Sequence, residues 1–269
     1  MLKGDIMRIQ IVFGMLLIGA ISTCYGVDLT GISDSNGVFS IAIDPAITED
    51  EYVAASVATN LAASAIVRLA AIQTLAKYPT PYLNILCELS RDPELAIPFA
   101  AAEALASCSP ADSTATAKRI IQQLTTTPPV RQGDNLFGLR AAALLAELND
   151  PSGFEYVAYR LLHAKFAAEK AAALAYLPKF RVFPGIPAAQ AILDYIKGTI
   201  PSLRQEGTEA YKEAIILLPK AFHALYRLQS IDTLPQLEEF KLILPDNLQQ
   251  NLQYYIQGLE AFQNNPPLP

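Results

Sequence analysis

The sequence predicts an all-α protein, an α–α superhelix of about four to five helix pairs. A short phrase with two central alanines and a later leucine occurs four times, at residues 67–76, 97–106, 139–148 and 169–178. Recurrence every roughly 30–45 residues is typical of helical repeat arrays, in which each helix pair buries its apolar face against the next pair. Small alanine side chains let helix axes come close together. We therefore expect the central alanines to be buried, namely Ala71, Ala102, Ala142 and Ala172.

Prolines and capping residues set the expected helix boundaries within a repeat domain over residues 47–263. Thr48 and Glu51 form a capping-box pattern, which predicts a helix up to about residue 63. Asp92 followed by a proline predicts another helix start, with Asp92 as the N-cap. Pro98 lies one turn into that helix, so we expect a kink or a late start there. Further helices are expected over 66–77, 82–89, 114–125, 135–148, 151–162, 165–177, 187–197, 205–217, 220–229, 234–244 and 246–263.

Two stretches resemble HEAT repeats of the class named after phycobilisome lyases: DPELAIPFAAAEALA at 92–106 and LRAAALLAELNDPSGFEYVAYRL at 139–161. The pattern of that class is Asp-Pro, Val-Arg, then Ala-Ala-x-x-Leu, a short turn and a second amphipathic helix. Arg68 and Arg140 fall on its arginine position, Lys170 substitutes there in the fourth unit, and Pro98 replaces it in the second. The resemblance covers residues 64–200 well and 205–262 only by helix pattern. It implies a HEAT-like solenoid.

The first 26 residues differ from the rest of the chain. Lys3 and Arg8 precede an apolar run over residues 9–21, and small residues follow it. This order is typical of a secretory signal peptide, and the run is shorter than the roughly 20 apolar residues of a membrane-spanning helix. An uncleaved N-terminal anchor is the alternative. Residues 27–46 are expected to form an irregular lead-in, with a short strand over 39–43, and residues 264–269 a flexible tail.

Cys24 has two interpretations. Ile21-Ser22-Thr23-Cys24 resembles a bacterial lipobox, in which the cysteine is lipidated, although Thr23 departs from the usual residue types at its position. Alternatively, residues 24–26 form an ordinary cleavage site and the mature chain begins at Val27. Both interpretations predict export, to the periplasm, the cell envelope or the cell exterior.

The two remaining cysteines, Cys87 and Cys108, are expected at different levels of adjacent antiparallel helices. At 1.5 Å per residue their separation along the helix axis is about 10 Å or more, whereas a disulfide needs Cα atoms within about 7 Å. We therefore expect two separate apolar core thiols.

Charge and motif content exclude several classes of function. The net charge of −6, without a basic cluster, argues against a nucleic-acid partner. The two histidines, His163 and His223, are about sixty residues apart and have no ligand spacing around them. No nucleophile elbow, phosphate loop or dinucleotide fingerprint is present in the sequence. We therefore expect no catalytic centre, no cofactor and no metal site.

The expected function is binding of a protein partner by the second helices of the pairs. Tyr156, Arg160, Tyr195 and Arg227 are the predicted contact residues, because tyrosine is favoured at interfaces and arginine pairs with carboxylates. Other tyrosines follow in the later units, at 211, 226, 254 and 255. The alternative is that these aromatic rings fill the core between repeats.

These observations predict an exported protein-binding scaffold or adaptor that contacts a membrane only through its N-terminal segment or a lipid on Cys24. The alternatives are a structural envelope lipoprotein or, as the family resemblance implies, a lyase-like cofactor chaperone.

Overall fold

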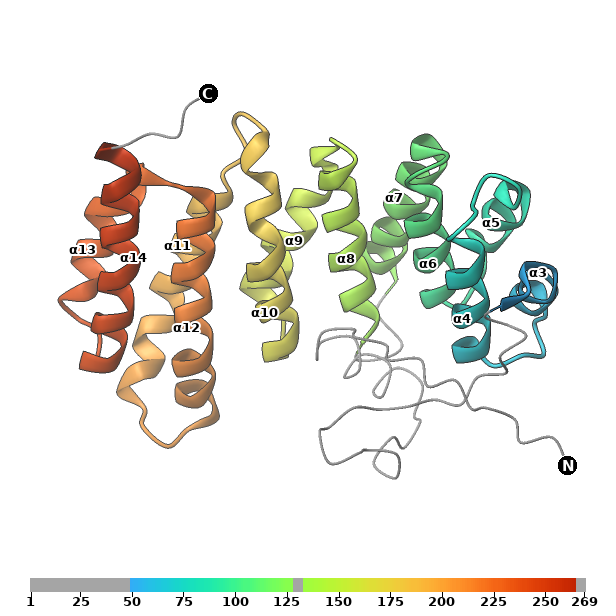
Figure 1. The fold of residues 1–269 in the computed structure, drawn as a ribbon. Helices are drawn as coiled ribbons and strands as arrows, with labels where there is room; N and C mark the ends of the chain where they lie inside the picture. Colours follow the sequence, from blue (N-terminus) through green and yellow to red (C-terminus); the bar gives the residue numbers. More distant parts are fainter. Residues whose placement is uncertain (1–48, 128–132, 265–269) are drawn as a thin grey trace, which may run out of the picture. The chain divides into compact units, whose positions relative to one another are not determined.

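The computed structural model describes residues 49–127 and 133–264, and these residues form twelve α-helices without a strand (Figure 1). The predicted all-α class is confirmed, with one helix pair more than the upper end of the predicted range. The chain divides into two compact units, residues 1–150 and 151–269, which are described separately. The expected signal peptide, Cys24, the lead-in with its strand, and Thr48 lie outside the described residues, as do residues 265–269.

The first unit packs its helices in two layers. One layer contains α4 (Ala65–Leu75), α6 (Ala96–Leu105) and α8 (Asp134–Glu147), where α6 contacts both α4 and α8. The other contains α3 (Glu51–Thr59), α5 (Leu83–Leu89) and α7 (Pro110–Thr126). Consecutive helices also contact one another across the layers, as in α3 with α4 and α6 with α7. Each repeat therefore buries its apolar face against its neighbours, as the sequence pattern predicts.

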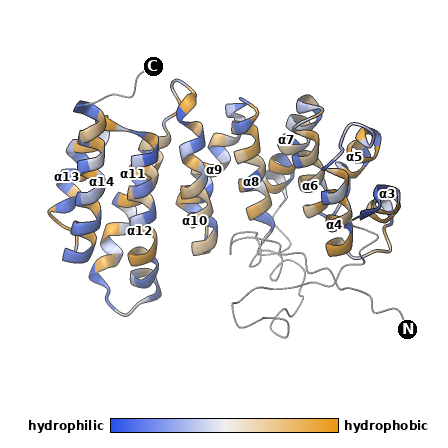
Figure 2. Cartoon of the chain, in the orientation of Figure 1, coloured by the Kyte–Doolittle hydropathy of each residue, from blue (hydrophilic) through white to orange (hydrophobic). Residues whose placement is uncertain are grey.

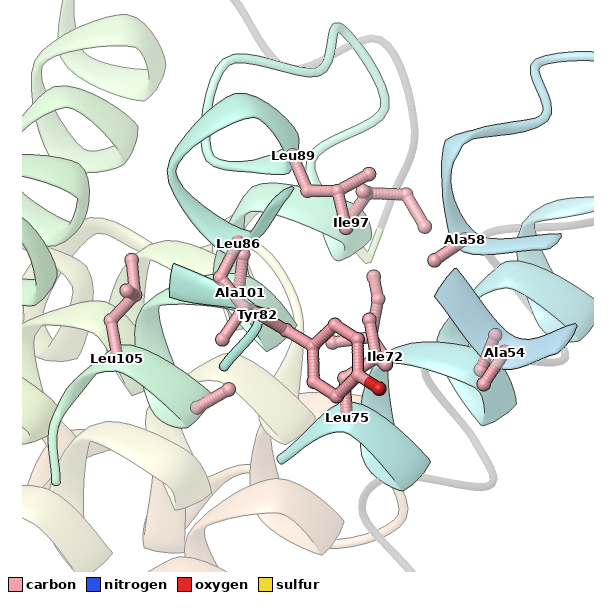
Figure 3. Packing of buried hydrophobic residues seen from close by; sticks show 12 residues of the cluster. Ala54, Ala58, Ile72, Leu75, Tyr82, Leu86, Leu89, Ile97, Ala101 and Leu105 are labelled. Atoms are coloured by element: carbon pink, nitrogen blue, oxygen red, sulfur yellow. The ribbon is translucent and has the colours of Figure 1, made fainter. Parts of the chain in front are cut away.

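The repeated alanines of the first unit lie at these helix contacts. Ala71, Ala102 and Ala142 are fully buried, which confirms the predicted register. Ala71 belongs to a core in which leucine and isoleucine side chains from α4, α5 and α6 pack with Tyr82 and with Ala54 and Ala58 of α3 (Figure 3). Because alanine occupies so little volume, the helices approach closely and larger side chains on either side complete the packing.

The second unit repeats the two-layer arrangement. One layer contains α10 (Ala167–Tyr176), α12 (Glu209–Leu228) and α14 (Asp246–Asn264), and α12 contacts both of the others. The other contains α9 (Phe154–His163), α11 (Ala188–Thr199) and α13 (Leu234–Lys241). Short 3₁₀ helices join these elements, at Pro151–Gly153, Leu177–Val182, Ile200–Arg204 and Ile231–Thr233. Ala172 is buried on α10, as predicted. Hydrophilic and hydrophobic residues alternate along the helices, as expected for amphipathic packing (Figure 2).

The repeated basic position serves to link neighbouring helices. In the first unit Arg68 of α4 pairs with Asp92, just before α6, at 2.5 Å, and its Nε donates to the Ala58 carbonyl at 2.9 Å. Arg140 of α8 pairs with Glu103 of α6 at 2.8 Å. The prediction that Asp92 is the N-cap of this helix was wrong, because α6 begins three residues beyond the proline and has Leu95 at its N-cap position. One carboxylate oxygen of Asp92 still accepts from the Glu94 backbone N–H at 2.9 Å, and the other accepts from Arg68.

The second unit has an equivalent link. Lys170 of α10 reaches Glu213 of α12 at 2.6 Å, and both side chains are largely buried. Thus the lysine that replaces arginine in the fourth phrase keeps the same structural role. The basic residue that recurs in the repeated phrase is therefore explained by ion pairs between neighbouring helices.

The starts of α3 and α6 compare differently with the sequence predictions. Asp50, rather than Thr48, caps α3, because its carboxylate accepts from the backbone N–H groups of Tyr52 and Val53. The helix around Pro98 starts late, at Ala96, which confirms one of the two expected outcomes. Pro98 then lies in the first turn, where its missing N–H costs no hydrogen bond.

The helices expected over 205–217 and 220–229 are one helix, α12, which continues through Pro219. A proline inside a helix removes one hydrogen bond and costs about 3 kcal/mol. Burial of Leu217, Leu218 and Phe222 on both sides of the proline offsets this cost. Gln229, in the left-handed conformation with φ of 55°, ends the helix.

Candidate functional site

The structure places two of the four predicted contact residues in the core. Tyr156 and Tyr195 are both buried within the second unit. Burial raises the pKa of Tyr195 to about 12, and the negative charge of Glu213 contributes to the increase. A hydrogen bond with the Thr199 side chain lowers this pKa but does not cancel the effect of burial. These two rings are therefore packing residues, so the prediction that they face a partner was wrong and the alternative interpretation holds.

The two predicted arginines differ from each other. Arg160 pairs with Glu169, whose carboxylate accepts from the guanidinium Nε at 3.0 Å and also from its terminal nitrogen. Glu169 is fully buried at the start of α10, so this ion pair ties α9 to α10. Arg227 is exposed in the last turn of α12. Of the four predicted residues, Arg227 is the one whose charged group is available to a partner.

Arg227 directly follows Tyr226, which belongs to an aromatic cluster between α12 and α14. These two helices are neighbours in the second unit (Figure 1). We call eight exposed or half-buried residues of these two helices the α12–α14 surface. Its members are Ile216, Lys220, His223, Tyr226 and Arg227 of α12 with Tyr254, Tyr255 and Phe262 of α14.

The rings of this surface contact one another in a continuous series. Tyr254 meets Tyr255 edge to face at 5.2 Å between ring centroids, and Tyr255 lies 5.8 Å from both His223 and Tyr226. Tyr226 continues to Phe262 at 5.3 Å. The Tyr255 hydroxyl lies 3.4 Å from His223 Nδ1. Such contacts hold the rings in place, so a partner would meet a preorganised aromatic face.

Gly258 makes this arrangement possible. A Cβ atom at position 258 would lie 2.7 Å from the Tyr226 ring, closer than any van der Waals contact allows. The absence of a side chain at Gly258 therefore leaves room for the Tyr226 ring to pack against α14. Tyr254, in contrast, is 70% exposed and offers its ring to solvent.

Among the described residues, no group of three His, Cys, Asp or Glu side chains could hold a metal ion. Cys87 and Cys108 do not form a disulfide, and both half-buried thiols pack against the core of the first unit. Burial raises the pKa of Cys87, and the Asp112 carboxylate beside it raises it further, which disfavours the nucleophilic thiolate. None of the described helices is long and apolar enough to cross a membrane.

The sequence already carried a signal for part of the α12–α14 surface. Tyr255, Gly258 and Phe262 are spaced by three and four residues, so they share one face of a helix. What the sequence alone does not tell is which helix they meet, and hence that His223 joins the cluster.

No family model matches this chain, and no curated protein is similar to it. Among solved structures, the crystal structure of an engineered protein shares 18% identity with it and has a TM-score of 0.42. That match covers 79% of this chain and 97% of the engineered protein. A likeness at this score supports no argument about fold or function, and the resemblance to HEAT repeats stays a prediction.

Proposed function

We propose that this protein is an exported, HEAT-like protein-binding scaffold, and that the α12–α14 surface binds its partner. The observation that carries the proposal is the aromatic series from Tyr254 to Phe262, which lies on two helices that pack together and is partly open to solvent. Tyrosine and arginine dominate the binding energy of protein interfaces, because they combine a large apolar area with a polar end.

The helical packing also supports this proposal. The buried alanines and the basic links between helices are accounted for by the fold, whereas the α12–α14 aromatic residues extend beyond the core. Export rests on the order of residues in the first 26 positions, and lipidation at Cys24 is the envelope-anchored variant of the same proposal.

Affinity capture with the tagged, processed protein tests the proposal. Ile216→Ser with Tyr254→Ser removes two exposed apolar side chains from the α12–α14 surface. The matched control is Leu61→Ser with Tyr78→Ser, which removes equally exposed side chains from the first unit. We expect the first pair to reduce recovery of the partner about tenfold, as for loss of an interface hot spot, and the control to leave it unchanged.

Equal recovery with both variants, at unchanged helix content, would remove this surface from the proposal. Mass spectrometry of the native chain tests export separately. We expect a terminus at Val27, or a lipid mass on Cys24, whereas an intact Met1 in a soluble cytosolic fraction would contradict export.

A further inference from the structure

A row of basic side chains runs along the exposed face of α12, next to the aromatic series. Lys220, His223 and Arg227 are exposed and spaced by three and four residues. At about 100° per residue, this spacing places them on one face of the helix, in continuation of the exposed Ile216. We call these three residues the basic stripe.

Several other cations of the chain are neutralised within the fold, unlike Lys220 and Arg227 of the basic stripe. Arg68, Arg140, Arg160 and Lys170 all form ion pairs with carboxylates. Among the described residues, neither Lys220 nor Arg227 has a carboxylate within ion-pair distance. The charge of the stripe therefore faces solvent.

The carboxylates of α12 itself are already occupied. Glu209 pairs with Lys212, and Glu213 pairs with Lys170, both in the first half of the helix. On α14, Glu260 is two residues from Phe262, which turns it about 200° around the helix from that aromatic face. The second half of α12 is thus a positive strip on a chain whose net charge is −6.

Arg181 extends the positive strip at its end. Its Nη1 donates to the Arg227 carbonyl at 3.4 Å, so the guanidinium lies at the C-terminus of α12. Attraction to the negative end of the helix dipole accounts for basic residues in the last turn. It does not account for Lys220, two turns earlier, because the dipole effect fades within one turn.

We propose that the basic stripe, extended by Arg181, binds the carboxylates of an acidic polypeptide segment that packs against the neighbouring tyrosines. This inference rests on the proposed function and specifies the chemistry of the partner. Lys220 and Arg227 are about 10 Å apart along the helix, a span suited to two or three carboxylates of one short segment. A nucleic acid is disfavoured, because its long row of phosphates would also meet the acidic remainder of the chain.

The test measures binding of labelled poly-glutamate to the full chain by fluorescence anisotropy, with poly-glutamine of equal length as the neutral probe. We expect poly-glutamate to bind more tightly and to weaken as salt is added, since exposed charges are screened. Lys220→Glu with Arg227→Glu should weaken binding at least about tenfold. The control is Lys165→Glu with Arg204→Glu, which reverses two other exposed cations of the same unit and should change binding less than about twofold.

Equal binding of the two probes, or equal loss with the control variant, would overturn the inference. So would a single-stranded oligonucleotide that binds as tightly as poly-glutamate. A captured partner that depends on Tyr254 but not on Lys220 and Arg227 would overturn the acidic segment and leave the proposed function standing. A partner that depends on none of these residues would overturn both.

Discussion

The ion pair between Arg68 and Asp92 offers the sharpest test of how the repeats are held together. Both side chains are almost completely buried, at 6% and 5% exposure, and Arg68 also donates to the Ala58 carbonyl. Arg68→Met keeps a long apolar chain but leaves the buried Asp92 carboxylate without its cationic partner, with only the Glu94 backbone N–H still donating to it. Breaking a buried ion pair from one side costs about 3–5 kcal/mol, mostly because an uncompensated charge remains.

Arg140→Met is the matched control, since it changes the same residue type at the same repeat position. The Arg140–Glu103 pair is more open, with side-chain exposures of 23% and 47%. An exposed pair contributes about 0–1 kcal/mol, and the guanidinium over the Phe99 ring adds roughly 0.5–1 kcal/mol. We therefore expect Arg140→Met to cost about 1–2 kcal/mol, clearly less than Arg68→Met.

The assay is urea unfolding followed by circular dichroism at the helix band, with the free energy of unfolding extrapolated to water. A second variant, Arg68→Met with Asp92→Asn, removes the unpaired charge and should recover part of the loss. Equal costs for Arg68→Met and Arg140→Met, or no recovery in the double variant, would refute the reasoning that burial sets the strength of these links.

Three further predictions concern packing and pH. Ala142→Leu inserts three heavy atoms at a fully buried helix contact and should lower the free energy of unfolding by about 1–3 kcal/mol; an unchanged thermal midpoint would refute the repeat register. Gly258→Ala should destabilise the protein, because its Cβ meets the Tyr226 ring, whereas Gly198→Ala, with open space around it, should stabilise it by about 0.5–1 kcal/mol in thermal melts. Tyr195 has its pKa raised to about 12 in the folded state, so its contribution to stability is complete below pH 10 and is lost as pH rises toward 12. Tyr195→Phe should lack that part of the alkaline decline, by up to about 2–3 kcal/mol, and an identical decline in both proteins would contradict the assignment.

The sequence was most informative where one physical effect dominates. The four central alanines were predicted to be buried and are, because close helix packing tolerates few other residues there. The missing N–H of Pro98 predicted either a kink or a late start, and α6 starts late. Pro219 shows the limit of the same rule, since burial on both sides of it keeps α12 continuous.

The candidate site was harder to predict, because a tyrosine can face the core or the partner with the same helical spacing. Tyr156 and Tyr195 turned out to be buried, and Arg160 found Glu169 on the next helix. Tyr254 is exposed, but it lies on α14, in the other layer of the second unit from Tyr156 and Tyr195. These choices depend on contacts between helices, which a single sequence does not contain.

Hydrogen exchange of the protein with and without its captured partner tests the central claim most directly. The account predicts slower exchange on binding for amides in residues 216–227 of α12 and 254–262 of α14, which carry the α12–α14 surface. Residues 65–75 of α4, in the other unit, should exchange at the same rate in both samples. Slower exchange confined to the first unit, or no change in α12 and α14 at saturating partner, would contradict the claim that this surface binds.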